Sequence, residues 1–283
     1  MTIKRRDFLG TVAAGSAVIT MPGFLTGCGV QSATTVAEPM PENPFMDWFG
    51  VDQATVSRVM SELTSRGADT ADLYFQHSRS NSLTLEDGIV SSANSGIQQG
   101  VGLRVVIGEQ TGYAFTEDLA LPSMLAAAQT ASAIASGSRI VAPQSFNPLA
   151  SGDLYTTTVP WSAVGVDQKL PVMKFIEQQA KAKDSAIEKV AVYWGDGEER
   201  VMIATLDGKL VTDHRPMARV TVVVTAKKGD ETQTGYSNIA AREEFGWFSE
   251  SRLATMVDEA VDRTLIQFEA KRPPAGEMPV ILA

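Results

Sequence analysis

Short segments of alternating apolar and polar residues, separated by turn dipeptides, recur along most of this chain and restrict its fold. Leu73 and Phe75 alternate with polar neighbours, and so do Leu83 and Leu85, which is the period of a half-buried strand. Asp87-Gly88 follows, a dipeptide that tolerates the positive φ of a two-residue hairpin turn. The pattern therefore predicts sheets built from hairpins.

The same alternation predicts strands in both halves of the chain. In the first half we expect them around residues 73–75, 83–85, 89–95, 100–107 and 112–116. In the second half we expect them at residues 190–194, 201–206, 209–212, 218–226 and 232–237, with turns at Asp196-Gly197, Asp207-Gly208 and Gly229-Asp230. The runs are short, so the prediction is one of many brief antiparallel strands.

Helical periodicity occurs in four segments between these runs. Apolar residues recur at helical spacing in residues 51–66, 119–136, 166–183 and 251–268. Pro122 fits the first turn of the second of these helices, where a missing N–H costs nothing. The predicted fold class is therefore α+β, with two subdomains of antiparallel hairpins packed against helices.

The composition limits the classes of function. The chain has 24 Lys+Arg against 33 Asp+Glu and a net charge of −9, whereas a nucleic-acid binder needs a basic face to neutralise phosphates. One Cys excludes an intrachain disulfide and any metal site built from several cysteines. At 44% hydrophobic residues, the chain has enough apolar side chains for a globular core.

The first 27 residues are typical of an export signal rather than of a folded element. A basic segment ending in Arg5 and Arg6 precedes a mildly apolar stretch at residues 8–25. Arg5, Arg6, Phe8 and Leu9 resemble the twin-arginine export signature, which is an address read by a receptor. We therefore expect the mature protein in the periplasm or the cell envelope.

The single cysteine lies where lipid attachment would place it. Cys28 follows Leu25, Thr26 and Gly27, a pattern that resembles a bacterial lipobox, in which the cysteine becomes the lipidated first residue of the mature chain. Residues 28–44, rich in Pro, Ser, Thr and Ala, predict a flexible tether. Any attachment to a membrane is expected through the lipid on Cys28 alone.

Composition divides the rest of the chain into two subdomains. We expect an N-terminal domain at residues 45–140, a Pro-containing linker at 141–165 and a central domain at 166–272. Residues 273–283 begin an apolar strand, at 278–283, that has no flanking elements to bury it. We interpret this segment as the start of a C-terminal domain that is missing from the chain.

The histidines and glycines predict no catalytic or metal centre. His77 shares a strand face with Leu73 and Phe75, His214 lies in a predicted loop, and neither has partners at zinc-ligand spacing. Gly96, Gly100 and Gly102 match no phosphate-binding motif. In a strand such glycines more often mark a bulge or a close backbone approach.

The charged residues likewise predict no catalytic or metal-binding site. The acid pairs Glu86-Asp87, Glu198-Glu199 and Glu243-Glu244 lie near predicted turns or element ends, where solvated carboxylates are expected. Arg104 lies between Leu103 and Val105 on a predicted strand, so it would be a buried ion-pair partner or, alternatively, a contact for a bound peptide. No catalytic or metal-binding residue is assigned.

Several strand-and-turn segments resemble the TldD/PmbA family of metallopeptidases. They are residues 71–77 (ADLYFQH) with 85–90 (LEDGIV), 99–104 (QGVGLR) with 112–114 (GYA), and 274–282 (PAGEMPVIL), the last like the start of the family's C-terminal domain. The resemblance covers roughly residues 50–283. It is nearer to the metal-bearing, TldD-like members than to their metal-free partners, and it includes no catalytic residue.

The resemblance implies a zinc-dependent peptidase of small or unfolded peptides, with subunits that pair, often one with metal and one without. It also implies an enclosed active site that a substrate enters extended, for which strand addition to a sheet edge is the natural mode of capture. The family's zinc motif, a His-Glu-x-x-x-His helix with a later Cys, is absent from this sequence. No cofactor is therefore expected in this chain, and zinc is expected in full-length members.

Three functions follow as alternatives. The first is the N-terminal portion of an exported TldD-like zinc metallopeptidase, without its own metal site. The second is a non-catalytic, peptide-binding or partner-subunit lipoprotein of the same family, acting in a homo- or hetero-oligomer. The third is an enzyme of another class whose site the sequence does not reveal. The unfinished apolar strand favours the first.

Overall fold

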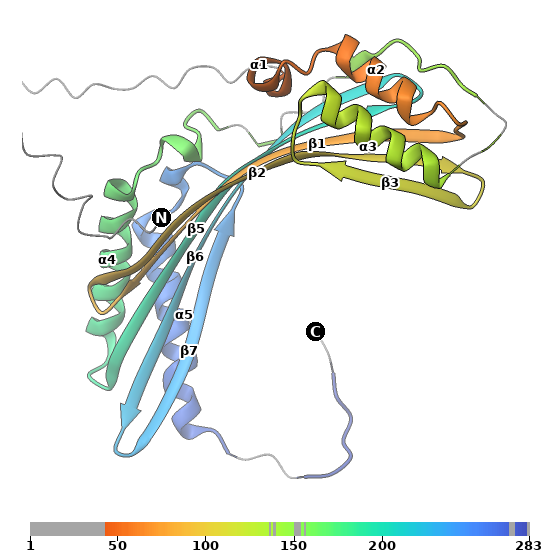
Figure 1. Ribbon diagram of the computed structural model, residues 1–283. Coiled ribbons are helices and arrows are strands. Elements are labelled where there is room, and N and C mark those ends of the chain that lie inside the picture. Colours follow the sequence, from red (N-terminus) through yellow and green to blue (C-terminus); the bar gives the residue numbers. More distant parts are fainter. Residues whose placement is uncertain are drawn as a thin grey trace, which may run out of the picture. The chain divides into compact units, whose positions relative to one another are not determined.

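The computed structural model describes residues 43–135, 137, 140–149, 154–155, 157–271 and 275–281. Within this part of the chain, helices pack on a large and mainly antiparallel sheet, which confirms the α+β class (Figure 1). The helices are α1 (Pro44–Phe49), α2 (Gln53–Leu63), α3 (Leu121–Ile134), α4 (Val166–Lys183) and α5 (Glu250–Leu265). The strands are β1 (Thr70–Glu86), β2 (Ile89–Ile107), β3 (Gln110–Thr116), β4 (Asn147–Leu149), β5 (Ile187–Thr205), β6 (Lys209–Lys228) and β7 (Glu231–Ala241).

One seven-stranded sheet runs through both predicted subdomains. Its order is β3-β2-β1-β5-β6, and β6 also pairs with both β4 and β7. All pairs are antiparallel except the short parallel pair of β4 with β6. The pairing of β1 with β5 joins the strands of the first half of the chain to those of the second.

The predicted hairpin turn between β1 and β2 is confirmed. Asp87 has φ of 47° and Gly88 has φ of 79°, so both central residues occupy the left-handed region that a type I′ turn requires. Asp87 is the one non-glycine residue with positive φ in the described part of the chain. The predicted turns at Asp207-Gly208 and Gly229-Asp230 also separate strands.

Most of the short strands predicted from the sequence merge into a few long ones. Asp196-Gly197 was expected to be a turn, but it lies inside β5, paired with β1 on one side and β6 on the other. Residues 83–85 belong to the same strand as 73–75, and residues 89–95 to the same strand as 100–107. The prediction failed because polar residues in the middle of each strand interrupt the apolar alternation.

The predicted loop around His214 is also wrong, because His214 and Pro216 lie within β6. Proline lacks the N–H that a strand partner would accept, so it is tolerated only at an unpaired edge. β6 pairs with β4 up to Val211 and with β7 from Ala218 onward, so Pro216 falls in the interval between them. Among the described strands, Pro216 thus has no partner on this side of β6, which explains how proline fits a long strand.

The apolar C-terminal segment does not form the strand expected of it. Residues 275–281 belong to no helix or strand, and Val280 and Ile281 are 73% and 94% exposed. Within the described part of the chain they make no contribution to the sheet.

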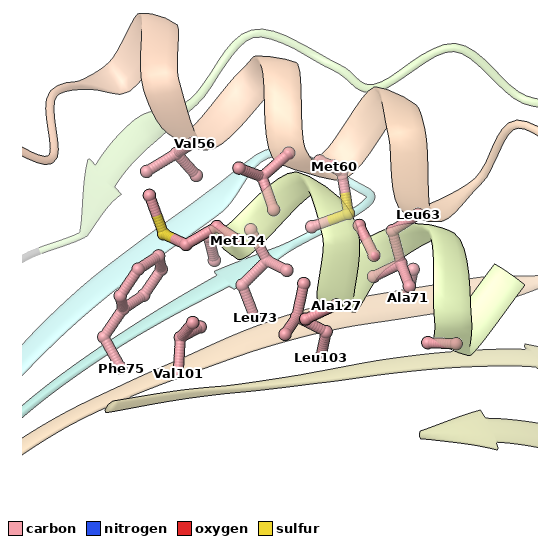
Figure 2. Close-up of a cluster of buried hydrophobic side chains, with 14 of the residues drawn as sticks. Val56, Met60, Leu63, Ala71, Leu73, Phe75, Val101, Leu103, Met124 and Ala127 are labelled. Atoms are coloured by element: carbon pink, nitrogen blue, oxygen red, sulfur yellow. The ribbon is translucent and has the colours of Figure 1, made fainter. Parts of the chain in front are cut away.

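Two hydrophobic cores lie on the same face of the sheet. Leu73 and Phe75 belong to the first core and Leu83 and Leu85 to the second, and even spacing along β1 puts all four on one face. Helices α1, α2 and α3 cover the first core, and α4 and α5 cover the second. Figure 2 shows the first core, where Val56 and Met60 of α2 meet side chains of the strands and of α3.

A buried ion pair fixes α4 to the sheet. Lys169 Nζ lies 2.5 Å from Asp196 Oδ2, and the two side chains are only 5% and 0% exposed. Asp196 also accepts hydrogen bonds from Trp194 Nε1 at 3.0 Å and from Asn81 Nδ2 at 2.9 Å. The carboxylate thus connects α4, β5 and β1, and its charge is balanced in a site without water access.

Replacing Lys169 with methionine should destabilise the fold strongly. The substitution leaves Asp196 as a buried charge without its counterion, which costs about 3–5 kcal/mol. The free energy of unfolding, measured by urea titration, should fall by that amount. Lys209→Met is the matched control, because the Lys209–Asp207 pair is exposed and screened by water, and it should change stability little. Equal effects of the two substitutions would contradict this role for the buried pair.

Candidate functional site

The face of the sheet opposite the helices carries a groove of about 1160 Å³ at its β1–β2–β3 end. Asp72, Tyr74 and Gln76 of β1 line it, alternating with the core residues Leu73 and Phe75 that face the helices. The other lining residues come from β2, β3 and the segment after β3: residues 97–102, Arg104, Tyr113 and residues 115–118. Val101 is the exception among them, since its side chain belongs to the first core. No described helix covers the groove side of these strands, so the groove is accessible.

An ion pair crosses the groove floor between β1 and β2. Asp72 and Arg104 are direct partners in the sheet, and Asp72 Oδ2 accepts from Arg104 Nη2 at 2.7 Å and from Nε at 2.8 Å. The sequence predicted an ion pair for Arg104 but placed it in the interior. The Arg104 side chain is 56% exposed, so the pair lies on the open face. The alternative, a contact for a bound peptide, stays a prediction.

The glycines of β2 make room for neighbouring groups. A Cβ on Gly102 would lie 2.9 Å from the Tyr113 hydroxyl, and a Cβ on Gly100 would lie 2.7 Å from the Thr116 carbonyl oxygen. Both contacts are too close for a side chain. The close backbone approach is therefore confirmed at Gly100 alone. At Gly102 the neighbouring group is the Tyr113 side chain, and a Cβ on Gly96 would meet only Ser80 Oγ at 3.6 Å.

Two aromatic side chains of β3 stand exposed beside the groove floor. Tyr113 is 55% exposed and Phe115 is 68% exposed, and they face Arg104 and Gly102 across the β2–β3 pair. Sequence reasoning missed both, because an aromatic residue in a strand is usually a core residue. An exposed aromatic pair next to a guanidinium group is suited to contact with the apolar parts of a polypeptide.

The groove continues past the end of β3 to the outer edge of β2. The pairing of β2 with β3 stops at Val101 and Thr116. Among the strands that the structure describes, residues 89–100 of β2 have β1 as partner on one side and none on the other. Residues 97–100 of this edge line the groove together with residues 116–118.

A second polar network lies on the same face, further along the sheet. Arg215 of β6 donates from Nε to Asp213 at 2.7 Å and lies 3.6 Å from Glu199 of β5. The hydrogen bond to Asp213 raises the pKa of Arg215, so the guanidinium group stays charged. The open face therefore carries fixed charges in compensated pairs.

The two histidines lie on one row of the sheet, on its helix side. His77 of β1 and His214 of β6 are each paired in register with Arg200 of β5. His77 contacts Trp48 with ring centroids 4.8 Å apart, as expected of a structural histidine. Burial and, secondarily, the charge of Arg79 lower the pKa of His77, which favours its neutral form. The guanidinium group between the histidines opposes a metal ion at this row.

Glu198 is not the solvated turn residue that the sequence suggested. It lies inside β5, and its Oε1 accepts a hydrogen bond from the Trp161 backbone N–H at 2.6 Å. Burial raises the pKa of Glu198, although this hydrogen bond acts in the opposite direction. Glu244 fits the solvated interpretation better: it accepts from Thr158, and that contact lowers its pKa.

The described residues contain no group of three or more His, Cys, Asp or Glu side chains that could hold a metal ion. No helix among them is long and apolar enough to cross a bilayer. The predicted export and lipid-attachment residues, Arg5, Arg6, Phe8, Leu9 and Cys28, lie outside the described part of the chain.

Two segments of the chain match models of one protein family. Residues 71–135 match PmbA/TldA metallopeptidase domain 1, and residues 159–268 match the PmbA/TldA metallopeptidase central domain. The sheet therefore runs through both of the segments that these two models match. The chain belongs to the PmbA/TldD metallopeptidase family, as the sequence resemblance predicted.

Curated relatives agree with this assignment. The chain is 31% identical over 235 residues to a metalloprotease TldD homolog of Haemophilus influenzae, covering 81% of this chain and 49% of the relative. It is 23% identical over 242 residues to a metalloprotease TldD homolog of Buchnera aphidicola (subsp. Schizaphis graminum), covering 82% and 50%. The chain thus spans about half the length of the curated relatives it matches.

Solved structures share the fold at lower identity. A Thermotoga maritima protein described as a modulator of DNA gyrase aligns with a TM-score of 0.61 and 16% identity, over 79% of this chain and 50% of that one. TldE from Thermococcus kodakarensis aligns with a TM-score of 0.54 and 17% identity, over 72% and 46%. At these identities the similarity establishes the fold alone.

Proposed function

We propose that this chain is the N-terminal, peptide-binding portion of an exported TldD-like zinc metallopeptidase that acts on small or unfolded peptides. The observation that carries the proposal is the match of both halves of the chain to metallopeptidase domains. The accessible groove with its exposed aromatic pair supports a role in holding the substrate. Because the described residues offer no cluster of metal ligands, no catalytic step is assigned to them.

The groove chemistry fits an extended polypeptide of unspecified sequence. Tyr113 and Phe115 offer apolar surface, while the Arg104–Asp72 pair offers a donor and an acceptor without net charge. Such a surface can contact an extended peptide of almost any sequence, because few of the contacts depend on the identity of the peptide's side chains. Zinc, held by residues of the family's C-terminal domain, would supply the activated water.

A chimera tests this function. The chain is joined to the second half of the Haemophilus influenzae relative, supplied with zinc and given a short unstructured peptide. We expect hydrolysis by the chimera, no hydrolysis by the chain alone, and loss of activity with a chelator. Tyr113→Ala with Phe115→Ala should raise KM with little change in kcat, because binding is lost equally in the ground and transition states.

Tyr236→Ala is the control for this pair, because Tyr236 is 57% exposed and does not line the groove. A folded, zinc-loaded chimera that cleaves no peptide would refute the peptidase proposal. If the chain binds peptide but the folded, zinc-loaded chimera cleaves none, the result would favour the alternative, a non-catalytic subunit that pairs with another TldD/PmbA subunit.

Export and lipid attachment form a second part of the proposal. We infer that the twin-arginine segment with Arg5 and Arg6 directs the protein to the periplasm or cell envelope, where the lipid on Cys28 would hold it. Residues 1–44 fused to a folded reporter should be exported, and Arg5→Lys with Arg6→Lys should retain the reporter in the cytoplasm. Cys28→Ala should release it from the membrane fraction. Normal export of the double variant would contradict the assignment.

A further inference from the structure

The outer edge of β2 exposes a row of main-chain groups over residues 89–100. β3 pairs with β2 only from Val101 to Ile107, so this stretch has no outer partner among the described strands. Every second residue of such an edge directs its N–H and C=O outward, unpaired. The edge can therefore accept one more strand.

A bulge at Ser91 interrupts the hairpin-turn end of this edge, and beyond it the sequence offers no protection against pairing. Residues 89–100 (IVSSANSGIQQG) contain no charged residue and no proline, and most of them are exposed. Exposed edges in natural proteins are generally blocked by lysine, proline, a bulge or a covering segment. The register irregularity of β1 with β2 falls between Thr84 and Leu85, close to the hairpin turn, and leaves residues 92–100 in regular pairing. Residues 92–100 of β2 are thus suited to pair with an added strand.

The edge and the groove form one continuous surface. Residues 97–100 of the edge and residues 116–118 after β3 both line the groove. A strand added to this edge would lie where β3 would run if it continued. Its end nearest to Thr116 would therefore lie beside the groove and its aromatic pair.

Acidic residues lie at both ends of the uncharged edge. Glu117 and Asp118 are exposed where β3 ends, and hydrogen bonds from Ser123 and Ala120 lower the pKa of Asp118. Glu86 and Asp87 are exposed at the hairpin turn. A strand of matching length would meet negative charge at each of its ends.

Basic side chains near the edge do not cancel this charge. Lys181 contacts Asp87 at 3.1 Å but also Glu177 at 2.8 Å, so it is shared between two carboxylates. Arg79 lies one strand further in, directly opposite Glu198 of β5. The ends of the edge therefore favour an occupant with basic ends.

The same charges oppose a second copy of this chain as the occupant. Antiparallel pairing of two β2 edges would bring the hairpin turn of one copy, with Glu86 and Asp87, against Glu117 and Asp118 of the other. Like charges would then meet at both ends of the shared ladder, which is unfavourable.

We propose that the outer edge of β2, residues 89–100, binds an extended peptide by strand addition, and that it selects peptides with an uncharged central segment and basic ends. The proposal rests on the peptide-binding function proposed above and names its substrate class. Main-chain hydrogen bonds supply affinity without sequence preference in the centre, and Glu86, Asp87, Glu117 and Asp118 supply the preference for basic ends.

Three labelled peptides of about twelve residues, the length that matches this edge, test the proposal with the whole chain. All are acetylated and amidated, with a core of Ser, Thr, Val and Gln. One has two lysines at each end, one has two glutamates, and the third has lysine ends but prolines in its core. Fluorescence anisotropy should show the lysine-ended peptide binding about fivefold or more tighter than the glutamate-ended one at low salt, and no binding of the proline peptide.

Proline substitutions in the β2 edge test strand addition from the side of the protein, as the proline peptide tests it from the side of the ligand. The N–H groups of consecutive strand residues point to opposite edges, so one of Asn94→Pro and Ser95→Pro removes only an outward N–H. The more stable of the two variants, identified by thermal unfolding, should bind the lysine-ended peptide about tenfold more weakly because it loses a main-chain bond and shape complementarity. Asn94→Ala and Ser95→Ala keep the N–H and should bind normally.

Each result separates this proposal from the broader one. Equal binding of the proline peptide, or of the stable proline variant, would overturn strand addition, and equal binding of the glutamate-ended peptide would overturn the charge selection. Concentration-dependent dimerisation that the proline variant abolishes would identify a second copy as the occupant and overturn the proposal. A chimera whose hydrolysis is unaffected by the edge variant would retain the peptidase function while this inference fails.

Discussion

The antiparallel pairing of β1 with β5 is the constraint on which the rest of the structure depends. It joins the strands of two successive domains into one sheet, with a register that runs without interruption from Asp72 to Glu86. Because side chains alternate along β1, both cores then fall on one face, where helices α1 to α5 pack. The opposite face carries the groove, and because β3 is short, residues 89–100 of β2 have no outer partner among the described strands. The buried Lys169–Asp196 pair adds a polar contact that fixes α4 to this shared sheet.

Much of the fold could be predicted from the sequence, but the length of the strands could not. The α4 helix and the Asp87-Gly88 turn follow from local patterns of apolar spacing and turn chemistry. The middles of the strands contain polar residues such as Asp196, which local reasoning assigns to turns. Their partners, Lys169 on α4 and Asn81 on β1, are distant in sequence, so only the folded chain shows that the charge is compensated.

The candidate site was predictable only in part, for a similar reason. Arg104, Gly100 and Gly102 stand out in the sequence as unusual residues of a strand, and all three line the groove. Tyr113 and Phe115 do not, because their exposure depends on which face of β3 the helices leave open. The free edge of β2 depends on the difference in length between β2 and β3. That difference in length is set by how the strands pair, and strand pairing cannot be predicted from any single segment of the sequence.

We propose that peptides bind to the open face and edge of this sheet and not to its helix side. Hydrogen–deuterium exchange of the whole chain, with and without an unstructured peptide, measures this directly, since added main-chain hydrogen bonds slow amide exchange. The account predicts slower exchange in residues 89–100 and 113–118 when peptide is present, and unchanged exchange in α4 and α5. Protection confined to the helices, or no protection at the β2 edge at saturating peptide, would contradict it.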